Sequence, residues 1–160
     1  AIQYRTYRFV ASGATEFFIM AYIPRTNRHL LLGFIRLRLS TTLEEHSVLP
    51  ELVGKTAMIR ELHVYGNVSP VGTGDGKAKA SAQHLGIGKK LLAAAEALAY
   101  YEGYGKVAVI SGIGVRDYYR KRGYELVGTY MIKSVQVPIM ITTIYWLFLI
   151  CLILRIISLV

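Results

Sequence analysis

Hydrophobic and polar residues alternate along the first part of the chain in a way that predicts an antiparallel hairpin. Residues 15–23 are rich in aromatic and branched side chains and stop at Pro24, and residues 24–28 are a polar turn. In residues 30–39, apolar side chains come to alternate with basic ones, as in a half-buried strand. Residues 57–65 have a third strand-like pattern, which ends at Gly66.

The middle of the chain predicts a strand, a loop, a helix and a second strand. Residues 67–82 contain four glycines or prolines and few apolar residues, which is typical of a mobile insertion. After Gly88, apolar residues recur with helical spacing at Leu91, Leu92, Ala95, Leu98 and Ala99, and we expect the helix to end before Gly103. Residues 106–111 are apolar almost throughout, as in a strand covered on both faces and parallel to the strand before the helix. We expect a short helix at 115–122 and a closing strand at 123–131.

The last segment is different in character. Residues 139–160 are almost wholly apolar, and at a helical rise of ~1.5 Å per residue they would reach about 30 Å, enough for a bilayer core. We therefore expect a domain at 1–134 and an apolar C-terminal helix within 135–160 that is a candidate membrane anchor. Arg155 opposes this interpretation, although near the far end its charge can reach the head groups. The alternatives are that the segment packs on the domain or another subunit, or is an aberrant end.

Composition limits the partners. The chain has 160 residues, of which 53% are hydrophobic and 18% charged, so one globular unit with an appendage is expected. Its 19 Lys and Arg residues against 10 Asp and Glu favour a polyanionic partner, which could be a nucleotide cofactor, RNA or an acidic membrane surface. The single cysteine, Cys151, lies in the apolar segment, so we predict no disulfide framework and no metal site. The start at Ala1, without methionine, suggests a fragment or a processed product.

A short loop with two glycines opens the predicted helix and has the form of an anion cradle. Gly86 and Gly88 allow the backbone to approach a phosphate closely, and the helix start adds unpaired amides and a partial positive charge. The same two glycines are also compatible with an ordinary tight loop. The sequence does not match a P-loop, and Asp117 stands where a dinucleotide-binding motif after Gly112 and Gly114 would need a small residue.

Four motifs in order carry a resemblance to a known family. They are Arg-Glu-Leu-His-Val-Tyr-Gly at 60–66, Gln-His-x-Gly-x-Gly at 83–88, Val-Ala-Val-Ile-Ser-Gly at 107–112 and Tyr-Tyr-Arg-Lys-x-Gly-Tyr at 118–124. Over residues 4–133 the chain resembles the GNAT superfamily of N-acetyltransferases and, within it, the acetyltransferase domain of Elongator complex catalytic subunits. The resemblance implies an α/β fold, the GNAT acyl-CoA N-acyltransferase fold, with a mixed central sheet and helices on both faces.

The resemblance also implies an activity and residue roles. It implies that the chain takes the acetyl group from acetyl-CoA for modification of the wobble uridine of tRNA, in the cytoplasm, with tRNA and Elongator-type subunits as partners. The implied cofactor-binding residues are Glu61, Leu62, His63 and Val64 on the strand along the pantetheine arm, Gln83, Gly86, Ile87, Gly88 and Lys89 around the pyrophosphate, and Tyr119. Tyr119 is also the implied catalytic acid, which protonates the departing thiolate of coenzyme A. No general base is evident. We expect Glu61 and His63 to point to opposite faces of one strand, so that at most one of them faces the site.

The chain also departs from this family. The Elongator subunit works beside a radical-SAM domain with an iron–sulfur cluster held by three closely spaced cysteines, which this chain lacks. An iron–sulfur cluster and S-adenosylmethionine are therefore expected only if an upstream domain exists. Two other functions remain open: a stand-alone protein-lysine acetyltransferase, for which the basic surface is unfavourable, and a non-catalytic, membrane-held structural subunit with the same fold.

Overall fold

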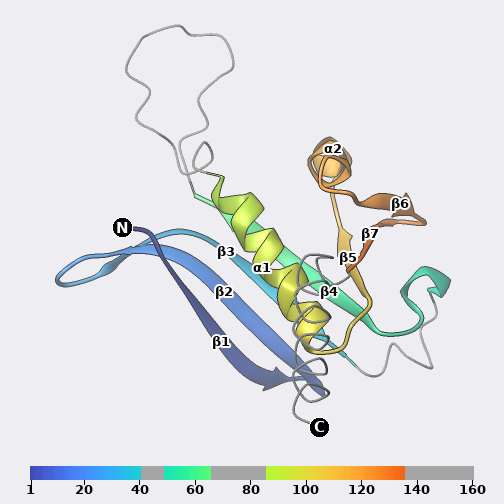
Figure 1. The fold of residues 1–160 in the computed structure, drawn as a ribbon, viewed down its shortest axis with the longest axis horizontal. Coiled ribbons are helices and arrows are strands. Elements are labelled where there is room, and N and C mark those ends of the chain that lie inside the picture. Colours follow the sequence, from blue (N-terminus) through green and yellow to red (C-terminus); the bar gives the residue numbers. More distant parts are fainter. Residues whose placement is uncertain (41–48, 66–85, 136–160) are drawn as a thin grey trace, which may run out of the picture.

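A mixed sheet of seven strands forms the body of the molecule, with one long helix packed along it (Figure 1). The computed structural model describes residues 1–40, 49–65 and 86–135. The strands are β1 (Gln3–Ala11), β2 (Ala14–Pro24), β3 (His29–Leu39), β4 (Thr56–Val64), β5 (Lys106–Ile110), β6 (Glu125–Val127) and β7 (Tyr130–Ser134), and the α-helices are α1 (Ile87–Tyr101) and α2 (Arg116–Arg120). Short 3-10 helices lie at Pro50–Leu52 and Ile113–Val115. The strand order is β1-β2-β3-β4-β5-β7-β6, and only β4 and β5 are parallel neighbours within the described residues.

The predicted hairpin is confirmed as β2 and β3, which pair antiparallel from Pro24 and His29 to Thr15 and Leu39. Alternation along β3 buries Ile35 and Leu37 completely, because every second side chain points to the face that α1 covers. The edge strand β1 was not predicted. Eight of its nine residues are exposed, so it lacks the burial pattern by which a strand is recognised in a sequence.

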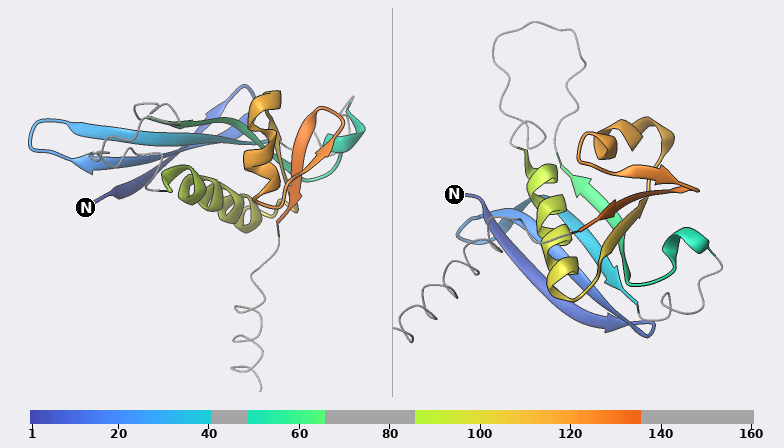
Figure 2. Two further views of the ribbon diagram at one scale, coloured as in Figure 1. Left: turned by 90° about the horizontal axis from the view of Figure 1, so that it is seen from above. Right: turned by 45° about the vertical axis from the view of Figure 1, so that its right-hand side comes forward.

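The strand–loop–helix–strand unit is confirmed as β4, α1 and the parallel strand β5. The helix buries Leu91, Leu92, Ala95 and Ala99, which lie along a single stripe because every turn of α1 contributes to it. That stripe packs on β2, β3, β4 and β5, and the long axis of α1 runs across one side of the sheet (Figure 2). Val107 and Val109 of β5 are part of the same hydrophobic core, as the apolar run at 106–111 predicts.

The closing strand predicted at 123–131 is wrong, because two glycines divide this segment. Gly123 has a φ of +82° and ends α2, with its amide bonded to the carbonyl of Arg120. Gly128 has a φ of +59° and turns the chain between β6 and β7, which pair antiparallel. The segment is therefore a helix cap followed by a small hairpin. The short helix at 115–122 is confirmed, as a 3-10 turn followed by α2.

Two α-helices contact the sheet in the part of the chain that the structure describes. We predicted helices on both faces; α1 packs along β2 to β5, whereas α2 contacts β7. The insertion at 67–82 and the apolar helix within 135–160 fall outside the described residues, apart from Val135. Among the helices that are described, none has the length and apolar character needed to cross a membrane.

Candidate functional site

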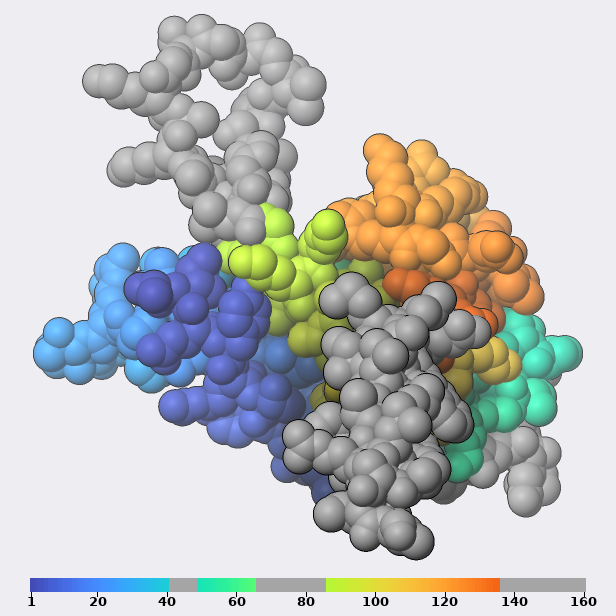
Figure 3. Space-filling model, viewed as in Figure 1, coloured from blue at the N-terminus to red at the C-terminus, as the bar shows by residue number. Residues whose placement is uncertain are grey.

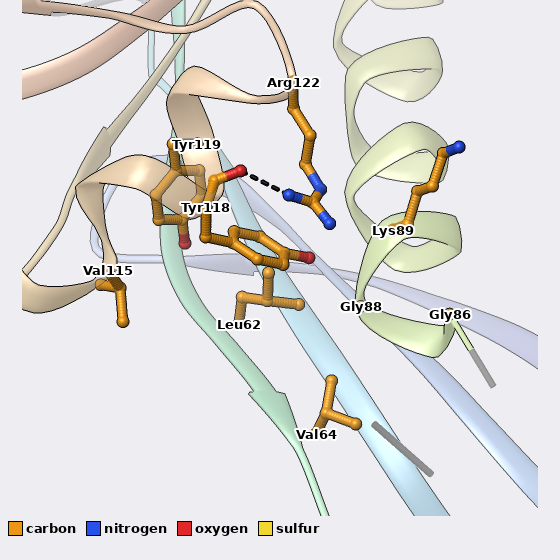
Figure 4. Close-up of a pocket in the computed structure, with 9 residues that line it drawn as sticks. All are labelled: Leu62, Val64, Gly86, Gly88, Lys89, Val115, Tyr118, Tyr119 and Arg122. Atoms are coloured by element: carbon orange, nitrogen blue, oxygen red, sulfur yellow. Dashed lines mark hydrogen bonds between the residues drawn. The ribbon is translucent and has the colours of Figure 1, made fainter. Parts of the chain in front are cut away.

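A cavity of about 450 Å³ opens where the end of β4, the start of α1 and the α2 segment meet (Figure 4). The space-filling view shows the start of α1 next to the segment that carries α2 (Figure 3). The cavity is lined by Leu62, Val64, Gly86, Gly88, Lys89, Val115, Tyr118, Tyr119 and Arg122. Six of these nine residues are among those that the sequence indicates: Leu62, Val64, Gly86, Gly88, Lys89 and Tyr119.

The last residues of β4 present a free backbone edge on the β5 side in the described chain. The two strands pair only from Thr56 to Ile59, after which β5 ends and the chain turns away toward α2 (Figure 2). On its other side, β4 continues to pair with β3 as far as Val64. The amides and carbonyls beyond Ile59 are therefore placed like those of an edge strand, which can add an extended ligand.

A β-bulge at Arg60 decides which side chains of β4 face the cavity. Leu37 of β3 is opposite Ile59, but its neighbour Arg36 is opposite Glu61, so one residue of β4 is extra. Ile59 is buried in the core, and after the bulge the same face is taken over by Leu62 and Val64, which line the cavity. The bulge therefore turns the side chains at the end of β4 toward the cavity.

The expectation that Glu61 and His63 point to opposite faces of their strand is wrong, although the consequence that at most one of them faces the site agrees with the structure. They lie two positions apart on β4 and share one face, because side chains alternate along a strand. Glu61 is 3.9 Å from Arg36, and the ring of His63 stacks at 5.8 Å on Phe34, on the face of the sheet opposite the core side chains. Neither lines the cavity, so any contact they make there would be through the main chain.

The first turn of α1 combines a left-handed residue with a close approach. Gly86 is the N-cap, with a φ of +67°, a conformation that favours glycine. As a glycine it has no side chain to accept from the amides of the first turn, which are left for another acceptor. A Cβ atom on Gly88 would lie 2.8 Å from the hydroxyl of Tyr118 and 3.3 Å from a methyl of Val64. Ile87 is fully buried, so only its backbone can serve a ligand.

Two adjacent tyrosines of α2 bracket the cavity (Figure 4). Tyr119 is 6% exposed and lies edge-on between Tyr118, at 5.2 Å, and Tyr124, at 5.5 Å between ring centroids. Burial and the neighbouring Tyr118 raise the pKa of the Tyr119 phenol, although Arg122 opposes the shift. Burial also raises the pKa of Tyr118. Both hydroxyls therefore stay protonated at neutral pH and can donate a proton.

The charge of the cavity is positive. Lys89 and Arg122 line it, and among the described residues neither a carboxylate nor an imidazole lines it. No cluster of His, Cys, Asp or Glu suited to a metal ion occurs among the described residues. The lining therefore suits an anionic ligand with an apolar part, which Leu62, Val64 and Val115 would contact.

Sequence reasoning missed Val115, Tyr118 and Arg122. Tyr118 directly precedes the predicted acid Tyr119 and could have been added to the site on that ground, whereas Arg122 lies beyond the end of α2 and has no signal in the sequence. Gln83, which the sequence also indicates, lies outside the described residues.

Comparison with known proteins gives a consistent result, although no protein-family model matches the sequence. Elongator complex protein 3 of Bos taurus is 44% identical over 129 residues, covering 80% of this chain and 22% of the relative. A tRNA uridine(34) acetyltransferase of Dehalococcoides mccartyi is 43% identical over 130 residues, covering 80% of this chain and 27% of the relative. The chain thus spans about a quarter of the length of these relatives.

Solved structures give the same picture. The archaeal Elp3 of Methanocaldococcus infernus, with an N-terminal deletion, superposes with a TM-score of 0.66 at 37% identity, covering 83% of this chain and 30% of that one. A GNAT-family acetyltransferase structure from Desulfovibrio desulfuricans, at 14% identity and a TM-score of 0.50, covers 76% of this chain and 70% of that one and shares the fold alone.

Proposed function

Because this chain is homologous to the C-terminal GNAT acetyltransferase-like region of Elongator complex protein 3, we propose that it binds acetyl-CoA in the cavity beside α1. We further propose that it supplies the acetyl group for modification of the wobble uridine of tRNA, as the name of the Dehalococcoides relative indicates for that protein. Elongator-type subunits are the proposed partners of the chain in this role.

The observation that carries the proposal is the convergence of three different ligand-binding features on one cavity. The free edge of β4 suits the amide groups of a pantetheine arm, which can pair with it as an added strand. The start of α1 suits the pyrophosphate, because its unpaired amides and partial positive charge favour an anion. Leu62 and Val64 lie between these two features and supply an apolar wall.

Tyr119 is the proposed acid of the transfer step. When the acceptor attacks the carbonyl carbon of the thioester, the carbon–sulfur bond breaks and its electron pair leaves on the sulfur. The pKa of a coenzyme thiol is ~8.5 by analogy with cysteine, so near neutral pH a proton from the Tyr119 hydroxyl assists its departure. The raised pKa of Tyr119 keeps that proton available. Among the described residues that line the cavity, none offers a carboxylate or imidazole as a general base, so the proposal assigns no base.

The whole reaction of the longer relatives needs more than this region. We propose that this chain contributes acetyl-CoA binding and acetyl release, and that any cluster chemistry resides in a separate part of the protein. From the sequence, we also propose that residues 135–160 are distinct from the domain at 1–134 and anchor it to a membrane. Fractionation of the full chain and of a chain ending at residue 136 tests this, since a full chain that stays out of the membrane fraction contradicts the anchor.

The proposed function is tested by calorimetric titration of the full chain with acetyl-CoA, followed by radiolabelled acetyl transfer with tRNA or with a lysine-rich protein as acceptor. Binding, together with tRNA-dependent release of the acetyl group, is the expected result. Transfer to protein without tRNA would favour a protein-lysine acetyltransferase. Absence of acetyl-CoA binding would contradict the assignment and favour a structural role for the fold.

A further inference from the structure

Arg122 has an unusual position at the mouth of the cavity. Its guanidinium carbon lies 3.4 Å from the centroid of the Tyr118 ring, so the planar group is stacked on that ring (Figure 4). One terminal nitrogen donates to the backbone carbonyl of Tyr118, which fixes the orientation of the fork. Within the described residues no carboxylate pairs with Arg122, and its buried Nε has no hydrogen-bond partner.

Tyr118 leaves a second polar group without a partner in the same place. Its hydroxyl is buried near Gly88 in the first turn of α1, and no described atom has the distance and angle of a hydrogen bond to it. A buried donor without an acceptor is costly, and such groups in a cavity are typically satisfied by a ligand or by water. Lys89, in the first turn of α1, lies on the other side of the Tyr118 hydroxyl and is exposed.

By contrast, the two cations that directly precede Arg122 do not line the cavity. Arg120 donates a hydrogen bond to Asp117, one turn earlier, at 2.5 Å and does not line the cavity. Lys121 is exposed and does not line the cavity. The Nε of Arg116, at the start of α2, is also buried without a partner, but Arg116 does not line the cavity. Arg122 is therefore the one cation of residues 116–122 that lines the cavity in the described structure.

We propose that Arg122 binds the pyrophosphate of acetyl-CoA from the side opposite the first turn of α1, with the Tyr118 hydroxyl as a further donor. The proposal rests on the proposed acetyl-CoA function. A guanidinium suits this task because its planar fork can donate two parallel hydrogen bonds to phosphate oxygens. Stacking on Tyr118 holds the fork before the ligand arrives, so less side-chain freedom is lost on binding.

The pyrophosphate, rather than the 3′-phosphate of the coenzyme, is the inferred group because of the position of Gly88. The Tyr118 ring on which Arg122 stacks reaches to within contact of Gly88, at the helix start that the proposed function assigns to the pyrophosphate. Coenzyme fragments separate the two possibilities. Acetyl-dephospho-CoA lacks the 3′-phosphate but keeps the pyrophosphate. Acetyl-pantetheine lacks the pyrophosphate and the adenosine part that carries the 3′-phosphate.

The experiment measures the affinity of the full chain and of its Arg122→Ala variant for acetyl-CoA, acetyl-dephospho-CoA and acetyl-pantetheine. We expect the variant to bind the first two ligands roughly 10- to 100-fold more weakly, the loss typical of a hydrogen bond to a charged group. Binding of acetyl-pantetheine should not change. Lys121→Ala, which removes the adjacent exposed cation, should leave all three affinities unchanged.

Each contrary result has a distinct meaning. A loss restricted to acetyl-CoA would assign Arg122 to the 3′-phosphate and overturn the proposal. An equal loss for all three ligands would show that Arg122 only supports the Tyr118 ring, and unchanged affinities would overturn the proposal directly. If the unaltered chain binds none of the ligands, the proposed function itself fails. If Arg122→Ala does not fold, Arg122→Lys replaces it, and a loss for the two pyrophosphate ligands alone is again expected.

Discussion

The hydroxyl of Tyr118 lies 2.8 Å from the point that a Cβ atom on Gly88 would occupy. The start of α1 and the α2 segment are therefore packed against each other with no room for a side chain at position 88. The approach of Tyr118 requires a glycine at position 88, and the proposed function adds the approach of a phosphate as a second reason. The adjacent Gly86 differs, because nothing lies within 4 Å of its Cβ position and its left-handed φ of +67° is the constraint.

Gly88→Ala should weaken acetyl-CoA binding with little loss of overall stability. The added methyl displaces the Tyr118 hydroxyl, which is the far end of a side chain, and presses on Val64 at 3.3 Å. Calorimetric titration measures the affinity, and urea unfolding measures the stability. Gly105→Ala is the control, because its Cβ position is open. Equal affinity of Gly88→Ala and the unaltered chain would show that the close approach of Tyr118 to position 88 does not affect coenzyme binding.

Gly86→Ala should act mainly on stability, because alanine in a left-handed conformation costs roughly 1–2 kcal/mol. Urea unfolding followed by circular dichroism measures this change. Gly86→Asn should cost less, since asparagine tolerates this conformation better. A Gly86→Ala variant as stable as the unaltered chain would show that the helix can begin with a different backbone geometry.

The sequence was informative wherever burial imposed a period. The hairpin of β2 and β3 and the stripe of α1 are read from apolar spacing, and the parallel pairing of β5 follows from an uninterrupted apolar run. The edge strand β1 gave no such signal, because its side chains are exposed on both faces. The turn at Gly128 was read as strand interior, since nothing local shows that its φ is positive.

The candidate site was predicted in its glycines and its tyrosine but not in its orientation. The bulge at Arg60 changes which residues of β4 face the cavity. Its trace in the sequence is the shift of the apolar positions from Ala57 and Ile59 to Leu62 and Val64, which a strand interpretation with one uniform period overlooks. Arg122 was missed for a different reason. Its importance comes from a stack on Tyr118 and from the absence of a carboxylate partner among the described residues, which only three-dimensional contacts reveal.

Tyr119→Phe should lower the rate of acetyl transfer by about 10²- to 10⁴-fold while leaving acetyl-CoA affinity unchanged, as expected for loss of a general acid. Because the pKa of Tyr119 is raised, the phenol remains a donor beyond neutral pH. The defect should shrink above pH ~8.5, where the thiolate no longer needs a proton to leave. Initial rates over a pH series measure this. A defect independent of pH would point to packing instead of proton donation.

Glu16→Gln should lower the free energy of unfolding by about 2 kcal/mol at neutral pH. Glu16 is 1% exposed and accepts from Arg38 and Arg60, each at 2.9 Å, and from Arg36 at 3.5 Å. The arginines are themselves partly exposed, which moderates the loss. Glu61→Gln, which affects a more exposed pair at 3.9 Å, should cost much less and is the control.

The pH dependence of this effect has a definite sign. Burial alone would raise the pKa of Glu16, but the hydrogen bonds and charges of the arginines prevail, and its pKa lies below the usual 4.5. Its stabilising contribution is therefore present above pH 4.5 and is lost as the pH falls through the lowered value. Urea unfolding at neutral and acidic pH should show the difference between Glu16→Gln and the unaltered chain narrowing in acid. A constant difference would mean that the carboxylate charge is not its source.

Tyr124→Phe should reduce acetyl transfer more than it reduces coenzyme binding. The Tyr124 hydroxyl donates to Glu96 of α1 at 2.9 Å, and the same carboxylate accepts from Lys133 of β7 at 2.7 Å. This network joins α1 to β7, and the Tyr124 ring lies against the proposed acid Tyr119. Loss of one hydrogen bond should cost about 1 kcal/mol of stability and loosen the Tyr119 ring, so the turnover rate should fall several-fold with little change in acetyl-CoA affinity.

Lys133→Met provides the matched comparison for Tyr124→Phe, because it removes the other donor to Glu96 and keeps the Tyr124 ring against Tyr119. It also removes the charge that lies 5.6 Å from the centroid of the Tyr124 ring. We expect a similar loss of stability in urea unfolding but a smaller loss of turnover. If both variants lower turnover equally, the network acts through the general stability of the fold. If only Tyr124→Phe does so, the ring of Tyr124 positions Tyr119 for proton donation.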